Sequence, residues 1–413
     1  MTAAPSPPTL TLGPGKDKLP RNRHPWIFSG ALESSSKARL SLWESDPAVA
    51  TQAARVQTAD HRFIGHAWVN PRSKIALRMI SWDDQLPRED EWLQTMLRRA
   101  FALRRDLGIA EDGITTAGRL VFSEGDGIPG VVVDRFADYL VLQLETYSAE
   151  VRRDMIIRGL EGCAGEFMPN LKGILEVSSG DGRAMEGLPP REALVWGSPP
   201  PDMVPIREYG VQSWVSLGLS RQKTGFYTDQ RENRRRVAAY SRGLNVLDIC
   251  SFTGAFSTAC LSAGAASSTA VDTSQEALDR AVLNARSWED RFSVVREDAF
   301  EFLRNLAPES QDMIILDPPK LVPSRRIKDR GLRAYKDGNL HALAALRPGG
   351  YLASFSCSGL VTREDFVAMI QWAAKDVQRD VQILEHLSQA PCHPVRTSFP
   401  EGLYLKGVIA RVL

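Results

Sequence analysis

Residues 245–254 read Asn-Val-Leu-Asp-Ile-Cys-Ser-Phe-Thr-Gly, and this stretch decides the fold class. Apolar residues run to the end of a predicted strand, and a helix-like segment follows at 255–263. A strand that turns directly into a helix is typical of an open α/β sheet, where the first such turn approaches a nucleotide-like ligand. We therefore expect a ligand site at this turn.

Strand-like and helix-length segments alternate for about two hundred residues after Pro205. The strand candidates are 245–249, 268–271, 292–295, 313–316, 351–356, 381–385 and 405–412. Helix-length segments separate the first six, which predicts right-handed crossovers in a doubly wound parallel sheet. The last two strands could be antiparallel, so the expected fold class is α/β with seven mostly parallel strands.

Two smaller domains are expected ahead of this sheet. Short apolar runs between turn residues over about 8–82 predict a small β domain. Residues 89–105 have helical spacing, and the strand-like runs and helix between 119 and 196 predict a central α+β domain. The expected domains are residues 1–84, 85–200 and 201–413.

The composition is that of an ordinary globular protein. The chain has 413 residues, of which 43% are hydrophobic and 24% charged. Its formal net charge of +1 argues against a uniformly positive surface. No apolar run is long enough to span a bilayer, and the first 26 residues lack the apolar stretch of a secretory signal. These two absences lead us to expect a cytoplasmic protein. The five cysteines have no zinc-ligand spacing, so we expect no metal site.

Three acids, Asp248, Asp272 and Asp298, end three successive predicted strands. The first loop has no G-x-G-x-x-G triplet, which disfavours a pyrophosphate and hence an NAD-dependent dehydrogenase. The acids suit S-adenosylmethionine (SAM), with Asp248 facing its ammonium group and Asp272 its ribose hydroxyls. Asp298 could receive the adenine amino group or cap the next helix. The loop residues expected to line the same cofactor site are Ser251, Phe252, Thr253 and Gly254.

The next two strands end in Asp317-Pro318-Pro319-Lys320 and in Ser356-Cys357-Ser358-Gly359. Neighbouring strand ends open onto one crevice, so Asp317 and Cys357 should face the same space, with Asp317 bordering the cofactor as well. A thiolate that adds to carbon 6 of a pyrimidine makes carbon 5 nucleophilic enough to accept a methyl group. The helix that begins after Thr362, with a capping-box pattern, or nearby Lys320 could favour the thiolate.

Basic residues gather in two further places. The segment Arg221–Arg231 interleaves aromatic and basic residues, which fits contact with a cofactor at Tyr227 or with a stacked base. Another basic cluster, Arg325–Lys336, follows the D-P-P-K loop and could contact phosphates. The residues expected to contact RNA are Lys223, Arg231, Lys320, Arg325, Arg326 and Lys328.

Six motifs together resemble the RlmI-like family of bacterial SAM-dependent 23S ribosomal RNA (cytosine-5) methyltransferases. They are L-P-R-N-R-H-P-W-I-F-S-G (19–30), E-G-D-G-I-P-G (124–130), K-T-G-F-Y-T-D-Q-R (223–231), D-P-P-K (317–320), F-S-C-S-G-L (355–360) and P-E-G-L-Y-L-K-G (400–407). The resemblance implies an N-terminal RNA-binding PUA domain, a central domain and a class I methyltransferase domain. It further implies that Cys357 is the nucleophile, that Asp317 holds the cytosine edge, and that the product is 5-methylcytosine in 23S rRNA.

Other interpretations stay open at this point. D-P-P-K differs by one residue from the loop of amino-group methyltransferases, although Lys320 cannot stack on a base. A non-catalytic RNA-binding assembly factor could keep the same fold. Pro319 and Lys320 stand where many RNA cytosine-5 methyltransferases carry a second cysteine, so the group that assists product release is unassigned. The target nucleotide is open, and so is a homodimer.

Overall fold

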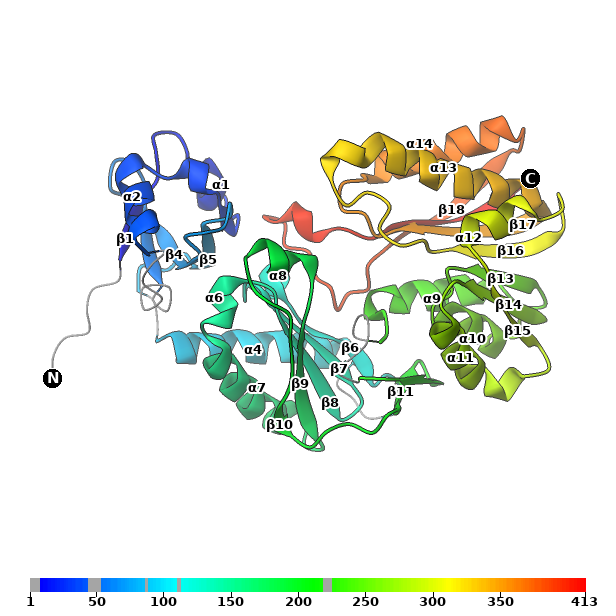
Figure 1. The fold of residues 1–413 in the computed structure, drawn as a ribbon, viewed down its shortest axis with the longest axis horizontal. Coiled ribbons are helices and arrows are strands. Elements are labelled where there is room, and N and C mark those ends of the chain that lie inside the picture. Colours follow the sequence, from blue (N-terminus) through cyan, green and yellow to red (C-terminus); the bar gives the residue numbers. More distant parts are fainter. Residues whose placement is uncertain (1–7, 44–52, 86–87, 110–112, 218–224) are drawn as a thin grey trace. The chain divides into compact units, whose positions relative to one another are not determined.

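The computed structural model describes residues 8–43, 53–85, 88–109, 113–217 and 225–413. These residues divide into two units, and the colours of Figure 1 follow the chain from its N-terminus to its C-terminus. Unit 1 consists of the described residues within Met1–Val204, Ser216–Gly225 and Cys392–Gly402, and unit 2 of Pro205–Val215, Phe226–Pro391 and Leu403–Leu413. A late segment of the chain therefore belongs to the unit that contains the N-terminal half. The domain boundaries expected at residues 84 and 200 stay predictions.

A five-stranded sheet with the order β1-β3-β4-β5-β2 begins unit 1. Its elements are β1 (Thr9–Thr11), α1 (Lys18–Arg21), β2 (Trp26–Ile27), α2 (Ser34–Trp43), β3 (Ala54–Gln57), β4 (Phe63–Val69) and β5 (Leu77–Ser81). Leu10, Val56, Ala67 and Met79 are buried in its core. The core draws on every strand of this small sheet, as its short alternating apolar runs predict.

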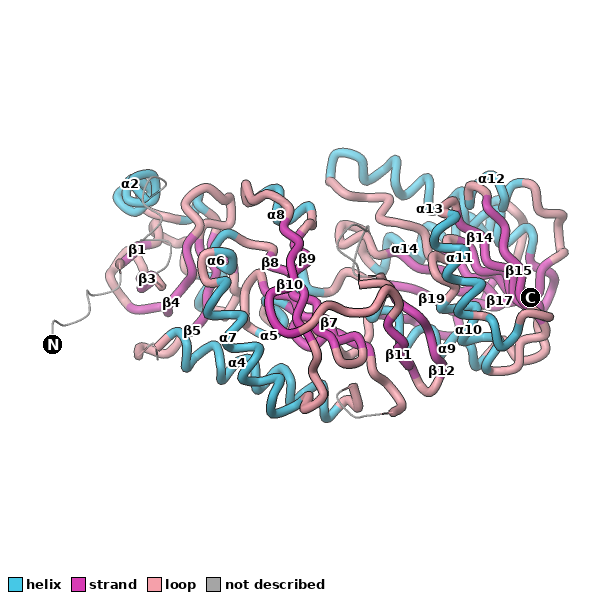
Figure 2. Tube along the Cα trace, turned by 60° about the horizontal axis from the view of Figure 1, so that its bottom comes forward, coloured by secondary structure: helices cyan, strands magenta, loops and turns pink. Residues whose placement is uncertain are grey.

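A second five-stranded sheet, with the order β10-β9-β8-β7-β6, forms the centre of unit 1. The strands are β6 (Ala117–Phe122), β7 (Val131–Phe136), β8 (Tyr139–Leu144), β9 (Gly173–Ser178) and β10 (Arg191–Gly197). The helices are α4 (Glu89–Asp106), α5 (Ser123–Asp126), α6 (Tyr147–Glu150), α7 (Arg153–Phe167) and α8 (Asp181–Met185). Helices α4 and α7 pack on each other (Figure 2), because Leu93 and Leu97 of α4 approach Gly159 of α7.

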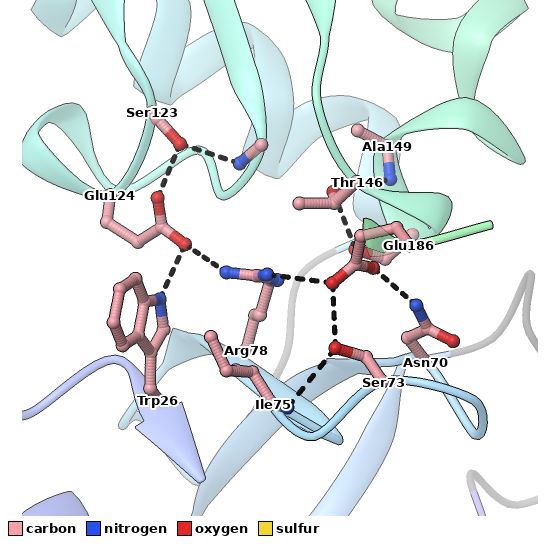
Figure 3. Close-up of polar contacts among 12 residues, drawn as sticks. Trp26, Asn70, Ser73, Ile75, Arg78, Ser123, Glu124, Thr146, Ala149 and Glu186 are labelled. Carbon is pink, nitrogen blue, oxygen red and sulfur yellow. Dashed lines mark hydrogen bonds and ion pairs between the residues drawn. The ribbon is translucent and has the colours of Figure 1, made fainter. Parts of the chain in front are cut away.

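Within unit 1 a buried charge cluster joins the first sheet to the central one. Figure 3 shows Arg78 of β5 between two carboxylates. Its Nη1 lies 2.6 Å from Glu124 Oε1 and its Nη2 lies 3.1 Å from Glu186 Oε1. Trp26 Nε1 donates to Glu124 at 2.7 Å, and Ser73 Oγ donates to Glu186 at 2.8 Å. One cation thus faces two carboxylates, and neutral donors such as Trp26 and Ser73 help to stabilise the remaining negative charge where water is scarce.

Unit 2 contains the seven-stranded sheet, whose order is β15-β14-β13-β16-β17-β19-β18. Its strands are β13 (Asn245–Ile249), β14 (Ser267–Asp272), β15 (Phe292–Arg296), β16 (Gln311–Leu316), β17 (Leu346–Ser356), β18 (Val381–Ser388) and β19 (Lys406–Val412). The first five are parallel, and β19 runs antiparallel to both β17 and β18. The mostly parallel seven-stranded sheet predicted from the sequence is confirmed. A two-stranded sheet of β11 (Val204–Glu208) and β12 (Val211–Val215) precedes it.

Helices cover both faces of this sheet (Figure 1). They are α9 (Arg231–Ala239), α10 (Ala255–Ser262), α11 (Gln275–Asn284), α12 (Ala299–Arg304), α13 (Lys328–Ala345) and α14 (Arg363–Asp376). Along β16, Ile314 and Leu316 pack with α12 and α13, whereas Met313 and Ile315 pack with α9 and α10. Burial of alternate residues on opposite faces explains why these strands are almost continuously apolar. The loops at their carboxyl ends carry the polar residues.

Candidate methyltransferase site

The turn after β13 adopts an unusual backbone. Cys250, Phe252 and Gly254 all have left-handed conformations, with φ values of 61°, 50° and 71°. Residues other than glycine rarely adopt such values, and their occurrence together marks a constrained turn. Phe252 N donates to Asp272 Oδ2 at 2.9 Å, so the acid that ends β14 holds this turn in place.

Several buried polar atoms at the turn have no hydrogen-bond partner within the described structure: Asp248 Oδ1, Ser251 Oγ and Thr253 Oγ1. Asp248 Oδ2, by contrast, accepts from Ser257 N at 3.1 Å and from Ser257 Oγ at 2.8 Å. Burial raises the pKa of Asp248 to about 7. A buried polar atom without a partner is costly, so these atoms fit a bound ligand that supplies donors and positive charge.

The other two acids differ in their surroundings. Asp272 accepts from Phe252 N through one oxygen and from Ser274 N, at 2.9 Å, through the other. Asp298 is the N-cap of α12, and its Oδ1 accepts from Phe300 N and Glu301 N. Of the two roles considered for Asp298, the helix cap is therefore present in the structure.

Asp317 follows β16 and is held by a chain of amides. Gln230 Nε2 donates to Asp317 Oδ2 at 2.9 Å, and Asn233 Nδ2 donates to Gln230 Oε1 at 2.6 Å. Burial, followed by the charge of nearby Asp229, raises the pKa of Asp317 to about 7. This carboxyl is thus poised to be protonated or ionised close to neutral pH.

Residues of two separate sequence motifs meet beside Asp317. Tyr404 OH donates to Asp229 Oδ2 at 2.6 Å, and Ala390 N donates to Asp229 O at 2.8 Å. The half-exposed ring of Tyr227 lies edge-on to Phe252, with 5.4 Å between ring centroids. The segment around Tyr227 therefore reaches the same loop as the acid-ended strands.

Cys357 follows β17 in a loop that is held from several sides. Tyr335 OH lies 2.9 Å from Ser358 Oγ, which also accepts from Val322 N at 3.1 Å. Lys406 Nζ donates to the carbonyl oxygens of Ser358 and Val361, both at 2.6 Å. Burial lowers the pKa of Lys406 to about 8, whereas the neighbouring Cys357 acts in the opposite direction. A buried ammonium thus lies within electrostatic reach of the thiol.

Helix α14 begins directly after this loop. Thr362 and Asp365 form a full capping box, in which each side chain accepts from the backbone N–H of the other residue. The capping pattern read from the sequence is confirmed.

Two family models match the chain: a PUA-like domain at residues 10–82 and an S-adenosylmethionine-dependent methyltransferase at residues 186–391. Ribosomal RNA large subunit methyltransferase I of Serratia proteamaculans is 38% identical over 411 residues, which covers 98% of this chain and 99% of that protein. The chain belongs to the ribosomal RNA large subunit methyltransferase I family. The protein of that name from Yersinia pestis is 37% identical over 417 residues, with 98% and 99% of the two chains covered.

Solved structures share the fold at low sequence identity. A Streptococcus mutans protein proposed to be a SAM-dependent methyltransferase has a TM-score of 0.79 at 21% identity, covering 98% of this chain and 100% of its own. A protein proposed to be a methyltransferase, solved in complex with SAH, has a TM-score of 0.80 at 20% identity with the same coverage. The family resemblance and the class I fold are confirmed, and SAM is the cofactor of this methyltransferase domain.

The residues expected to contact RNA differ in their exposure and in their partners. Lys223 lies outside the described residues. Arg231 is only 2% exposed and is hydrogen-bonded to Glu232, so it does not belong to an exposed basic face. Lys328 is ion-paired with Asp365. Lys320, Arg325 and Arg326 are exposed.

Gln230, Tyr335 and Lys406 are not among the site residues that the sequence predicts. Gln230 and Lys406 lie inside the motifs at 223–231 and 400–407, but a motif does not show which residue each side chain contacts. Tyr335 lies within a stretch read only as basic. No group of three or more His, Cys, Asp or Glu side chains suited to a metal ion occurs among the described residues. In the same part of the chain, no helix is long and apolar enough to cross a membrane.

Proposed function

We propose that the chain transfers a methyl group from SAM to carbon 5 of a cytosine in ribosomal RNA of the large subunit, in the cytoplasm. The names of its relatives support the class of substrate. The position of Cys357 carries the cytosine-5 chemistry. Leu316 of β16 pairs with Ser354 of β17 in parallel register, so Asp317 and Cys357 follow neighbouring strand ends.

The proposed reaction uses Cys357 as a temporary nucleophile. Its thiolate forms a bond to carbon 6 of the cytosine, and the displaced electron pair makes carbon 5 nucleophilic. SAM supplies the methyl group when it is bound. A base then removes the carbon 5 proton, and elimination breaks the bond between sulfur and carbon 6, which restores the thiolate. The residue that removes the proton is unassigned.

Asp317 is proposed to hold the edge of the cytosine ring. With its pKa raised to about 7, this carboxyl can donate a proton toward ring nitrogen 3 as negative charge develops there during thiol addition. Gln230 occupies one carboxyl oxygen and so fixes the direction of the other.

Lys406 is proposed to stabilise the Cys357 thiolate, because it is a nearly buried ammonium directed at the loop that carries the thiol.

RNA contact near this site is proposed for Lys320, Arg325 and Arg326. Lys328 and Lys336 of the same cluster already pair with Asp365 and Asp376, so they add less free positive charge. Neutralising Arg325 and Arg326 together should weaken RNA binding and leave SAM affinity nearly unchanged.

The test compares wild-type protein with Cys357→Ser on large-subunit rRNA from a strain that lacks the gene. Mass spectrometry of the digested RNA should find 5-methylcytidine with the wild type and at least about a thousandfold slower formation with the variant. Cys163→Ala, which removes a buried thiol on α7, is the control and should stay active. A methylated amino group on a base, or full activity of Cys357→Ser, would refute the proposal.

A further inference from the structure

Two arginines from distant parts of the sequence lie against one tryptophan in unit 1. Arg23 Cζ is 5.6 Å from the ring centroid of Trp82, and Arg396 Cζ is 5.9 Å from it. Trp82 Nε1 donates to Pro20 O at 2.8 Å, which fixes the orientation of the ring. The indole therefore holds two like charges in one small region.

Neither arginine has an acidic partner within 4 Å among the described residues. Asp126 is the one carboxylate that favours the charge of Arg396. Its Oδ1 and Oδ2 are taken by the two terminal nitrogens of Arg104, at 2.6 and 2.7 Å, and Phe122 N also donates to Oδ2. Burial, and then repulsion from Arg23, lower the pKa of Arg396. Two guanidinium groups that repel each other and have no acidic partner favour an anion that contacts them.

The surrounding structure holds both arginines in place. Arg23 has a left-handed backbone, with φ of 63°, which is unfavourable for a residue with a side chain and is typical of a functional turn. Arg396 belongs to Cys392–Gly402, and contacts of His24 with Glu401 and of Trp26 with Phe399 anchor this segment. The Arg396 guanidinium also packs on Gly127, 3.5 Å from where a Cβ on that residue would lie.

We propose that Arg23, Trp82 and Arg396 form a binding site for a backbone phosphate of the substrate RNA. Arginine binds phosphate through paired N–H donors, and a polyanion would relieve the repulsion between the two cations. Lys16 and Lys18 are exposed on the same N-terminal segment, and exposed Phe28 offers a surface on which a base could stack. This inference rests on the proposed function only in taking RNA as the substrate.

The test measures how tightly the full-length chain binds a large-subunit rRNA fragment at several salt concentrations. Arg23→Gln/Arg396→Gln should bind about tenfold more weakly, and the slope of log affinity against log salt should fall by about one. Arg62→Gln/Arg88→Gln is the control, because it removes two exposed arginines of unit 1 that are paired with Asp60 and Asp90. SAM affinity and the thermal midpoint of the test variant should match those of the wild type.

Wild-type affinity and slope in the test variant, or an equal loss in the control, would overturn the inference. A second measurement tests whether inorganic phosphate stabilises the wild type and the test variant. If it stabilises the wild type but not the test variant while RNA affinity is the same in both, the site binds a small anion and not RNA. If the test variant loses RNA affinity although no 5-methylcytidine ever forms, the phosphate site stands and the proposed reaction fails.

Discussion

Lys406 is buried, and its ammonium group lies within electrostatic reach of the Cys357 thiol. Its pKa of about 8 means that the lysine is charged below that pH and neutral above it. A charged lysine favours ionisation of a neighbouring thiol. The Cys357 thiolate should therefore persist to lower pH in the wild type than in a protein that lacks this cation.

Replacing Lys406 by Met should raise the pH at which Cys357 reacts half-maximally with iodoacetamide by about one unit. The measurement is the rate of alkylation of the Cys357 peptide, followed by mass spectrometry from pH 6 to 10. Lys375→Met removes an exposed lysine of α14 and should leave the profile unchanged. Superimposable profiles for wild type and Lys406→Met would show that the lysine only supports the loop.

The sequence predicts which residues end a strand, but it does not predict which residues of other elements contact those strand ends. The alternation of strands and helices predicts that Asp248, Asp272, Asp317 and Cys357 lie at one edge of the sheet, where the structure has them, whereas their roles stay predictions. Lys406 could not be assigned a partner in that way, since its contact with the 356–361 loop depends on β19 pairing with β17. Order along the chain does not determine that pairing.

At the scale of elements, Asp248 joins strand β13 to helix α10 through its two hydrogen bonds with Ser257. The pKa of its carboxyl lies near 7 in the folded protein, above the ordinary value of 3.8. A group with a raised folded pKa contributes stability that is fully present below the unfolded pKa and is lost as the pH rises through the folded pKa. The strand-to-helix turn should thus be less stable at pH 8 than at pH 5 when no SAM is bound.

Asp248→Asn should remove this dependence, because asparagine stays neutral and can still accept from Ser257. The difference in free energy of unfolding between the variant and the wild type should shift in favour of the variant, on the order of 2 kcal/mol, between pH 5 and pH 8. Urea unfolding without SAM measures it. Asp279→Asn, at an exposed position of α11, is the control. A difference that does not change with pH would contradict the assignment of this shift to Asp248.

The elements themselves were predicted more completely than their arrangement. The alternating segments of unit 2 and the capping box at Thr362 follow from local patterns, and the structure confirms both. The order of the strands does not follow from them. Strand β19 lies between β17 and β18 although it is the last strand in the chain, because antiparallel pairing on both sides buries its apolar residues.

At the scale of the whole molecule, charge is distributed differently from the sequence expectation. The stretch Arg231–Arg236 contains four arginines, which by composition alone would favour an exposed basic face. Arg234 is instead buried and bound by both oxygens of Glu208, at 2.7 and 2.8 Å, and Arg236 pairs with Glu385. Their partners are far away in sequence, so a count of nearby charges could not reveal this neutralisation.

The buried Arg78 cluster gives a prediction for the stability of unit 1. Burial alone would raise the pKa of Glu124, yet Arg78, Ser123 and Trp26 hold it below its usual value. Arg78→Met would leave Glu124 and Glu186 buried without their cation and should cost about 3–5 kcal/mol in the free energy of unfolding. Arg62→Met, which removes an exposed ion pair with Asp60, should cost much less, because solvent screens that pair. Chemical denaturation monitors both, and equal losses would argue against a special role for the cluster.

The segment Cys392–Gly402 also has a consequence for how the protein is made. Arg104, with no exposed surface, donates to Cys392 O at 2.7 Å across 288 residues of chain. During synthesis from the N-terminus, this acceptor is made long after Arg104. The buried Arg104 guanidinium therefore lacks one of its acceptors until Cys392 has left the ribosome. A nascent chain stalled before residue 392 would leave this buried donor without its acceptor, so its N-terminal half should be more open to chaperones and proteases than in a chain that extends past Gly402.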